Sequence, residues 1–204
     1  MHALVESGFI TKIFNNPKGF TLNDIQYPQD IFYKWTKDEK EAIGIYEIIT
    51  DSSNFKDEAY YNNTNEEYTF TDNQVVRSWG TATPKRLEDE NAVDENGDPI
   101  LDDDGKQIIN YGLKTEKKRI IKDQASGLLA PTDWYVVKAT EVADYNVPEN
   151  ITIFRADVRS KSNEMETQID ACTNVDELKA LYEYTEQEDG TITRPLTEFP
   201  VLES

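Results

Sequence analysis

The side chains most often used in catalysis are scarce in this sequence. Its 204 residues include one histidine, His2, and one cysteine, Cys172. A zinc site, a Ser-His-Asp set or a Cys-His pair therefore cannot be assembled from this chain. The glycine-rich patterns that hold phosphate groups, GxGxxG and GxxxxGKS/T, are also absent. We expect no catalytic residues and no cofactor, and we predict that the chain is not an enzyme.

Carboxylates are the abundant chemical group, and they cluster between residues 94 and 105. Alternating acidic residues before a glycine resemble a Ca²⁺ loop. An EF-hand loop beginning at Asp94 needs glutamate at its twelfth position, however, and that position is Gly105. The sequence predicts no helices on either side. A solvated acidic hairpin is the better interpretation, and no metal site is predicted.

A few other side chains are candidates for contacts rather than for chemistry. Arg155 and Arg159 lie four apart on one face of a predicted helix; they could pair with carboxylates of a partner protein or of this acidic chain itself. Cys172 falls on an apolar stripe, which predicts a buried and unreactive thiol. Trp134 and Tyr135 could anchor either the core or an interface, and the core is favoured.

The charge balance narrows the choice of partner. The chain has 21 basic and 40 acidic residues, a net charge of −19. Nucleic acid and anionic membranes both attract positive surfaces, so neither is expected as a partner. Only 37% of the residues are hydrophobic, below the usual range of about 45–50%. An aromatic share of 11% argues against general disorder. Several small cores joined by polar segments fit these values.

The sequence also bears on where the chain is made. With one cysteine, no intrachain disulfide can form. The opening residues lack the basic and apolar regions of a signal peptide, and no apolar run approaches the roughly 20 residues that a membrane helix needs. We expect synthesis in the cytoplasm.

The first 87 residues are predicted to form a small β-rich module. Two hairpins are expected, one from residues 3–6 and 9–13 and one from residues 67–71 and 74–81. Thr36 and Glu39 match a capping box, which predicts a short helix that ends at Gly44. Residues 45–49 read as a strand, whereas residues 15–30 are predicted to be a loop.

The remainder of the chain is predicted as three segments, which makes the fold class α+β. Residues 88–113 are an acidic hairpin linker, residues 114–185 a helical hairpin and residues 186–204 an extended arm. The helical segment carries an apolar stripe at intervals of seven residues: Ile151, Val158, Met165 and Cys172. The arm ends in an apolar cluster, so Phe199, Val201 and Leu202 join Arg155 and Arg159 as predicted partner-interface residues.

Two regions resemble proteins of tailed bacteriophages. The first resembles the N-terminal module of small tail-associated proteins of marine and cyanobacterial phages, and it comprises residues 1–12, residues 43–48 and Trp79. The second is similar to the helical region of phage tail fibre assembly and fibre-associated proteins. It comprises residues 128–138 (LLAPTDWYVVK), Val147 with Pro148, residues 154–159 (FRADVR) and residues 173–178 (TNVDEL). In the second region Phe154 replaces the usual tyrosine, Val158 the usual leucine and Lys138 a frequent arginine.

The resemblance covers more than half of the chain, and it implies a role in the phage tail without catalysis or cofactor. We expect a structural component of the baseplate, tail fibre or fibre attachment, located in the virion tail after synthesis in the host cytoplasm. Its partners would be other phage tail proteins, and it would be a homo-oligomer in the assembled particle. Two alternatives stay open: a tail fibre assembly chaperone absent from the virion, and a receptor- or glycan-binding tail tip that uses Tyr60, Tyr61 and Tyr68.

Overall fold

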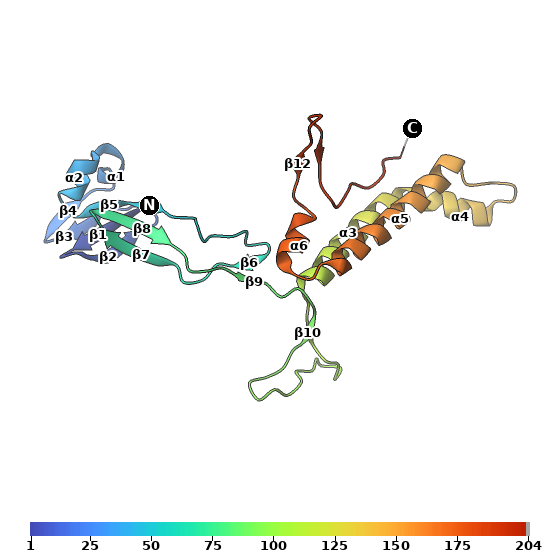
Figure 1. Ribbon diagram of the computed structural model, residues 1–204, viewed down its shortest axis with the longest axis horizontal. Coiled ribbons are helices and arrows are strands. Elements are labelled where there is room, and N and C mark those ends of the chain that lie inside the picture. Colours follow the sequence, from blue (N-terminus) through green and yellow to red (C-terminus); the bar gives the residue numbers. More distant parts are fainter. Residues whose placement is uncertain (203–204) are drawn as a thin grey trace. The chain divides into compact units, whose positions relative to one another are not determined.

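The computed structural model describes residues 1–202. Its fold class is α+β, as predicted, with a β-rich N-terminal region and a helical C-terminal region (Figure 1). The chain divides into two compact units, Met1–Pro84 and Lys85–Ser204, called unit 1 and unit 2 below.

Unit 1 is built on a five-stranded sheet with the order β2–β1–β5–β8–β7 (Figure 1). Its strands are β1 (His2–Glu6), β2 (Phe9–Phe14), β5 (Ile45–Thr50), β7 (Glu67–Thr71) and β8 (Gln74–Ser78). Neighbours are antiparallel except β5 and β8, which run parallel. The first hairpin forms as predicted, because Ser7 and Gly8 both take the positive φ that a tight two-residue turn requires. The second predicted hairpin is β7–β8.

The central strands of unit 1 are covered on both faces. Successive side chains of a strand point to opposite faces, so Leu4 joins one core and Ala3 and Val5 the other. The first core contains Leu4, Phe14, Ile31, Phe32 and Ile45, and the second contains Ala3, Val5, Ile48 and Val75.

Helix α2 (Lys37–Glu41) begins and ends as the sequence predicts. Thr36 and Glu39 form the complete capping box. Gly44 has φ +81°, and a Cβ atom there would lie 2.5 Å from the carbonyl oxygen of Val5. Glycine is therefore required at this close approach of helix end and strand.

The predicted loop over residues 15–30 is in part ordered, which corrects that expectation. Strands β3 (Phe20–Leu22) and β4 (Ile25–Tyr27) pair across Asn23 and Asp24, both with positive φ. Helix α1 (Ile31–Lys34) follows. The β3 and β4 aromatic residues pack on the first core, and a short ladder of β6 (Tyr61–Asn62) and β9 (Thr83–Pro84) completes unit 1.

Unit 2 is dominated by helices (Figure 1). They are α3 (Leu113–Leu129), the 3₁₀ turn η1 (Ala130–Thr132), α4 (Asp133–Glu141), α5 (Glu149–Ala171) and α6 (Val175–Ala180). Helix α5 packs along α3, and the predicted stripe is confirmed, since Ile151, Val158, Met165 and Cys172 are all buried. Asn174 caps α6 by accepting a hydrogen bond from the Glu177 amide.

Before α3 the chain forms an element of three short ladders, residues 90–110, called the three-armed element below. Strands β10 (Glu90–Asn91) and β11 (Ile109–Asn110) make the stem. Bridges between Val93 and Pro99 and between Leu101 and Gln107 make the two hairpin arms. The predicted acidic hairpin is thus a branched structure.

A closed ring of hydrogen bonds joins the three ladders at their meeting point. The Ala92 amide donates to Ile108 O (2.8 Å), the Ile108 amide to Ile100 O (2.9 Å) and the Ile100 amide to Ala92 O (2.9 Å). The Gln107 side-chain amide donates to the same three carbonyl oxygens, at 2.7–3.2 Å. Each carbonyl therefore accepts two hydrogen bonds, and the junction has its backbone groups satisfied without a large core.

The C-terminal segment is attached to unit 2. Strands β12 (Thr185–Glu186) and β13 (Ile192–Thr193) pair across Gly190. The Leu196 amide donates to Leu181 O at 2.9 Å, and the Leu196 side chain is 2% exposed. The described part of the predicted arm, 186–202, is therefore not a free extension, because Leu196 and Phe199 return to the core of its own chain.

Candidate protein-binding surfaces

Helix α4 carries several apolar side chains that the described chain leaves partly exposed. None of its residues is buried. Trp134 is 52% exposed, Val137 51% and Val136 41%. The prediction that Trp134 belongs to the core is therefore wrong, since half of the indole faces solvent. An exposed tryptophan beside exposed valines is typical of a protein-binding surface.

The start of α4 is held by Arg155, whose side chain is 11% exposed. The Arg155 guanidinium forms an ion pair with Asp133 at 2.8 Å and donates to Leu129 O at 3.1 Å and to the Thr132 hydroxyl. A planar guanidinium with several fixed donors suits this junction. Arg155, predicted at a partner interface, is thus occupied by contacts inside its own chain.

Arg159 lies one turn further along α5, in a groove of about 490 Å³ between α3 and α5. Its guanidinium donates to the Arg155 carbonyl oxygen at 3.1 Å, and no carboxylate of residues 1–202 forms an ion pair with it. The groove also has small side chains along its walls: Ala125, Ser126 and Ser162.

The predicted C-terminal contact residues divide into two groups. Phe199 packs on the core cluster of Ala125, Phe154 and Val158. Val201 is 84% exposed and Leu202 38% exposed. Phe199 therefore serves its own unit, whereas Val201 and Leu202 remain available for contacts with a partner.

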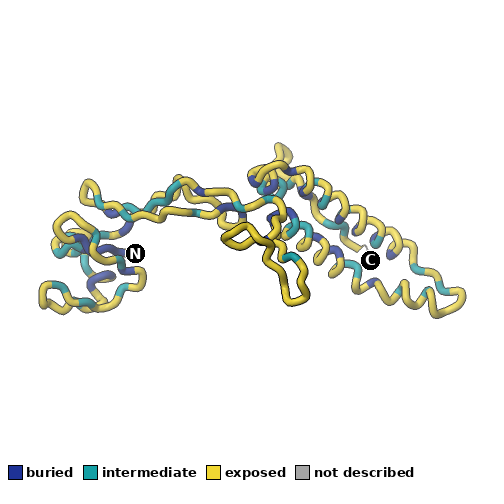
Figure 2. The backbone as a smooth tube through the Cα atoms, turned by 90° about the horizontal axis from the view of Figure 1, so that it is seen from below, coloured by how far each residue is buried: buried dark blue, intermediate teal, exposed yellow. Residues whose placement is uncertain are grey.

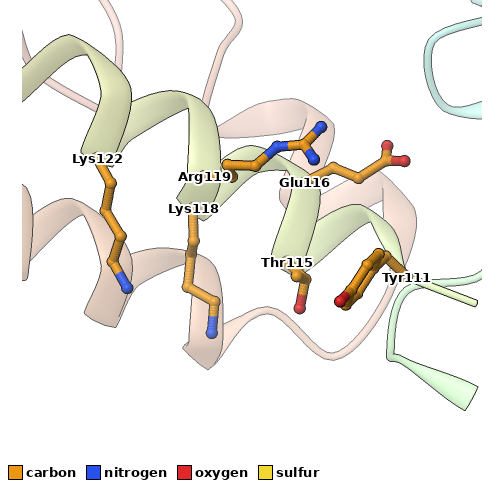
Figure 3. A pocket seen from close by; sticks show the side chains of 6 residues that line it. All are labelled: Tyr111, Thr115, Glu116, Lys118, Arg119 and Lys122. Carbon is orange, nitrogen blue, oxygen red and sulfur yellow. The ribbon is translucent and has the colours of Figure 1, made fainter. Parts of the chain in front are cut away.

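A second hollow, of about 450 Å³, lies along the first turns of α3 (Figure 3). Figure 3 shows Tyr111, Thr115, Lys118 and Lys122 pointing to one side of the helix. Lys118 pairs with Asp170 at 2.7 Å and Lys122 with Glu166 at 3.1 Å. The hydrogen bond that Lys118 donates to Asp170 raises the pKa of Lys118. These lysines are already neutralised, so the hollow is not a strongly cationic site.

Two carboxylates in the turns of the three-armed element, Asp94 and Asp102, accept hydrogen bonds within their own turns. Asp94 Oδ1 accepts hydrogen bonds from the Asn96 and Asp98 amides, both at 2.9 Å. These backbone bonds lower the pKa of Asp94. Asp102 makes the equivalent bonds in the second arm. Over residues 1–202 no group of three or more His, Cys, Asp or Glu side chains could hold a metal ion.

The single histidine, His2, and the single cysteine, Cys172, are both buried. Burial raises the pKa of the Cys172 thiol, which makes it a poor nucleophile at neutral pH. The pKa of His2 is lowered by burial and then by the nearby Lys40 ammonium, which lies 3.4 Å from His2 Nε2. Neither residue lies with a set of groups that suggests catalysis.

The aromatic residues suggested for glycan binding are not displayed as a platform. Tyr60 and Tyr61 are 5% and 4% exposed. Tyr68 is partly buried against the second core of unit 1, and its hydroxyl donates to Glu66 at 2.7 Å. Stacking on a sugar requires an open ring face, which the first two tyrosines lack.

Sequence reasoning missed the three-armed element, although a signal for it exists. Residues 92–99 (AVDENGDP), 100–107 (ILDDDGKQ) and 108–110 (IIN) repeat with a period of eight. Both complete copies have apolar residues at positions one and two, aspartate at position three and glycine at position six. The exposure of α4 had no comparable signal.

Comparisons with known proteins leave the chain without an identified relative: no family model matches it, and neither do the curated proteins or the solved structures. No helix among residues 1–202 is both long enough and apolar enough to span a lipid bilayer.

Proposed function

We propose that this chain is a structural component of a bacteriophage tail that acts through protein–protein contacts and not through catalysis. The observation that carries the proposal is helix α4, whose Trp134 and Val137 side chains are each about half exposed. The same helix lies within the sequence region that resembles fibre-associated proteins. The baseplate, a tail fibre or a fibre attachment point would be its position in the virion.

The structural arrangement supports this role over a glycan-binding tip. The tip would use Tyr60 and Tyr61, which are buried, whereas α4 exposes Trp134, Val136 and Val137. A tail fibre assembly chaperone would also use an exposed apolar helix, so it is the second candidate. The two differ in whether the chain stays in the finished particle.

Quantitative mass spectrometry of purified phage particles distinguishes these candidates. A structural component should be present at a fixed ratio to the known tail proteins after density-gradient purification. An assembly chaperone should be found in infected cells and be absent from the particles. Absence from particles would therefore overturn the structural proposal.

Variants of α4 test whether this helix is the surface that binds the tail. Replacing both Trp134 and Val137 by alanine should reduce incorporation into particles, whereas Val136→Ala should not. Both variants should retain the helical circular dichroism of the parent, because all three side chains are exposed. Equal incorporation of the two variants would show that α4 is not the surface that binds the tail.

A further inference from the structure

The three-armed element, residues 90–110, leaves apolar side chains from all three of its ladders in contact with solvent. Val93 is 50% exposed, Leu101 53% and Ile109 38%. Among the residues of the element only Ala92 is buried. Covering exposed apolar side chains is favourable, so an apolar patch with a polar rim is typical of a protein-binding surface.

The register of the three ladders places these side chains on one face. Residues opposite each other in an antiparallel ladder share a face, and successive residues alternate between faces. Each ladder pairs one of the three apolar residues with a cross-strand partner: Val93 with Pro99, Leu101 with Gln107, and Ile109 with Asn91. The Gln107 side chain lies at the meeting point, where it donates to a carbonyl group of each ladder. This surface, called the branch face below, therefore has apolar residues around a central amide.

The charge around the branch face is strongly negative. Residues 88–110 contain nine acidic residues and a single basic one, Lys106. These 23 residues therefore carry −8 of the net charge of −19, a density several times that of the remaining chain. The two arms, residues 94–106, hold six of the nine carboxylates, and all of these residues are exposed. The branch face thus combines an apolar centre with an acidic rim.

We infer that the branch face binds a basic segment of another protein. Apolar side chains of that segment would cover Val93, Leu101 and Ile109, while its lysine or arginine side chains meet the acidic arms. This pairing follows the usual anatomy of an interface, an apolar centre within a polar rim of complementary charge. The inference concerns a surface other than α4, and it does not depend on the proposed role in a phage tail.

Charge selects this occupant over the alternatives. A second copy of the chain would place a charge of −8 opposite an equal charge of −8, and like charges across an interface oppose binding. Nucleic acid and anionic lipid are repelled for the same reason. A cationic segment is instead attracted within the Debye length, about 8 Å at physiological ionic strength.

The branch face is held in shape before any partner binds. The ring of hydrogen bonds between the Ala92, Ile100 and Ile108 backbones fixes the three ladders relative to one another. Binding therefore orders little of this chain, which reduces its entropic cost. Because the face consists of three short ladders, the affinity for a short segment should be weak.

Titration of the isotope-labelled full chain with synthetic peptides, followed by nuclear magnetic resonance, tests the inference. The peptide KLKKLK supplies leucine and lysine, KSKKSK keeps the charge without leucine, and ELEELE keeps leucine with the opposite charge. We expect KLKKLK to bind with a dissociation constant of about 0.1–1 mM and to shift the Val93, Leu101 and Ile109 amides most. KSKKSK should bind at least about fivefold more weakly, and ELEELE should cause no shifts. Largest shifts outside residues 90–110, or equal binding of KLKKLK and KSKKSK, would overturn the inference.

A matched pair of variants tests the apolar centre. Leu101→Ser changes the branch face, whereas Ile153→Ser changes a side chain of α5 with the same exposure, 53%. Leu101→Ser should weaken the binding of KLKKLK at least about fivefold, and Ile153→Ser should leave it unchanged. Equal effects would contradict the assignment. The peptide comparison uses the parent protein, so it remains decisive if Leu101→Ser loosens the ring.

A second pair tests the acidic rim. Asp103→Asn combined with Asp104→Asn removes two charges from one arm. Asp123→Asn combined with Glu141→Gln removes two charges from the helices, where both residues are exposed. The arm variant should weaken the binding of KLKKLK more than the helix variant does. Equal weakening would show that only the net charge of the chain matters.

These outcomes are separable from those for the proposed function. If the chain is present in particles but KLKKLK does not bind the branch face, the tail role remains and the docking role is removed. Specific binding by a chain that is absent from particles would give the reverse result.

Discussion

Strand β1 in unit 1 and helix α4 in unit 2 are both short and rich in apolar residues, but only β1 is covered. Four of the five residues of β1 are buried, between two cores formed by its own unit. None of the nine residues of α4 is buried. The local hydrophobicity of a segment therefore does not decide whether its own chain covers it.

The difference arises from what lies on each side of the two elements. Strand β1 has β2 and β5 as neighbours in the sheet, and other strands and α1 supply side chains to both faces. Helix α4 contacts mainly the adjacent turn η1, and none of its residues is buried. The β1 side chains are thus enclosed by their own unit, whereas Trp134 and Val137 of α4 remain about half exposed.

The largest effect should come from a charge placed in the core of unit 2. Val158 is fully buried on α5, whereas Ile153 of the same helix is 53% exposed. Val158→Asp should lower the free energy of unfolding of unit 2 by more than about 4 kcal/mol, and Ile153→Asp should change it by about 0.5 kcal/mol or less. Helical circular dichroism during thermal unfolding measures both. Similar melting for the two variants would mean that α5 does not pack as described.

The C-terminal segment offers the next largest effect. Leu196→Ala removes a side chain that is 2% exposed and should cost about 2–5 kcal/mol. Val201→Ala changes a side chain that is 84% exposed and should cost at most about 0.5 kcal/mol. Urea titration of the two variants measures the difference in their free energies of unfolding. If Leu196→Ala left the free energy of unfolding unchanged, residues 186–202 would be a free arm after all.

A smaller, local effect is expected in the three-armed element. Gln107→Leu removes the amide that donates to three carbonyl groups, and it should favour local opening by about 1–3 kcal/mol. Hydrogen exchange of the Ala92, Ile100 and Ile108 amides should become faster, while α5 stays protected. Gln124→Leu, an exposed change on α3, is the control. Unchanged exchange after Gln107→Leu would show that the backbone ring alone holds the junction.

The smallest effect concerns pH and unit 1. Burial lowers the pKa of His2 in the folded state below its ordinary value of 6.5. The unfolded chain then binds the proton more readily, so the free energy of unfolding should fall as the pH drops below 6.5. His2→Gln should flatten this dependence between about pH 7 and pH 5, and no other histidine complicates the comparison. Parallel curves for parent and variant would contradict the lowered pKa.

Patterns with a local cause were predictable from the sequence. The Ser7-Gly8 turn, the Thr36–Glu39 capping box and the seven-residue stripe of α5 each depend on residues close together in the chain, and each forms as predicted. The α+β class follows from these elements. Arg155 and Arg159 were placed correctly on one helix, but spacing could not show that, of the two, Arg155 alone forms an ion pair with a carboxylate of residues 1–202.

Features that depend on long-range packing were not predictable in the same way. Trp134 is large and apolar, as core residues usually are. Its half-exposed position depends on how α3, η1 and α5 pack, which the local sequence does not reveal. Phe199 and Leu196 return to the core although glycine and prolines interrupt regular structure around them. The ring of Ala92, Ile100 and Ile108 required recognition of an eight-residue repeat, because no single turn signal implies a branched ladder.

The stem of the three-armed element has a consequence for engineering. Its two strands pair directly, so the chain enters and leaves residues 90–110 at neighbouring positions. Beyond the stem, α3 is anchored separately, since the Leu113 and Lys114 amides donate to Arg86 O and Leu87 O. The arm tips are exposed throughout residues 94–106, as Figure 2 shows for the backbone. An epitope or fluorophore-binding peptide inserted at Asn96-Gly97 or Asp104-Gly105 should therefore leave the helices in place, which makes this branch a practical site for labelling the protein.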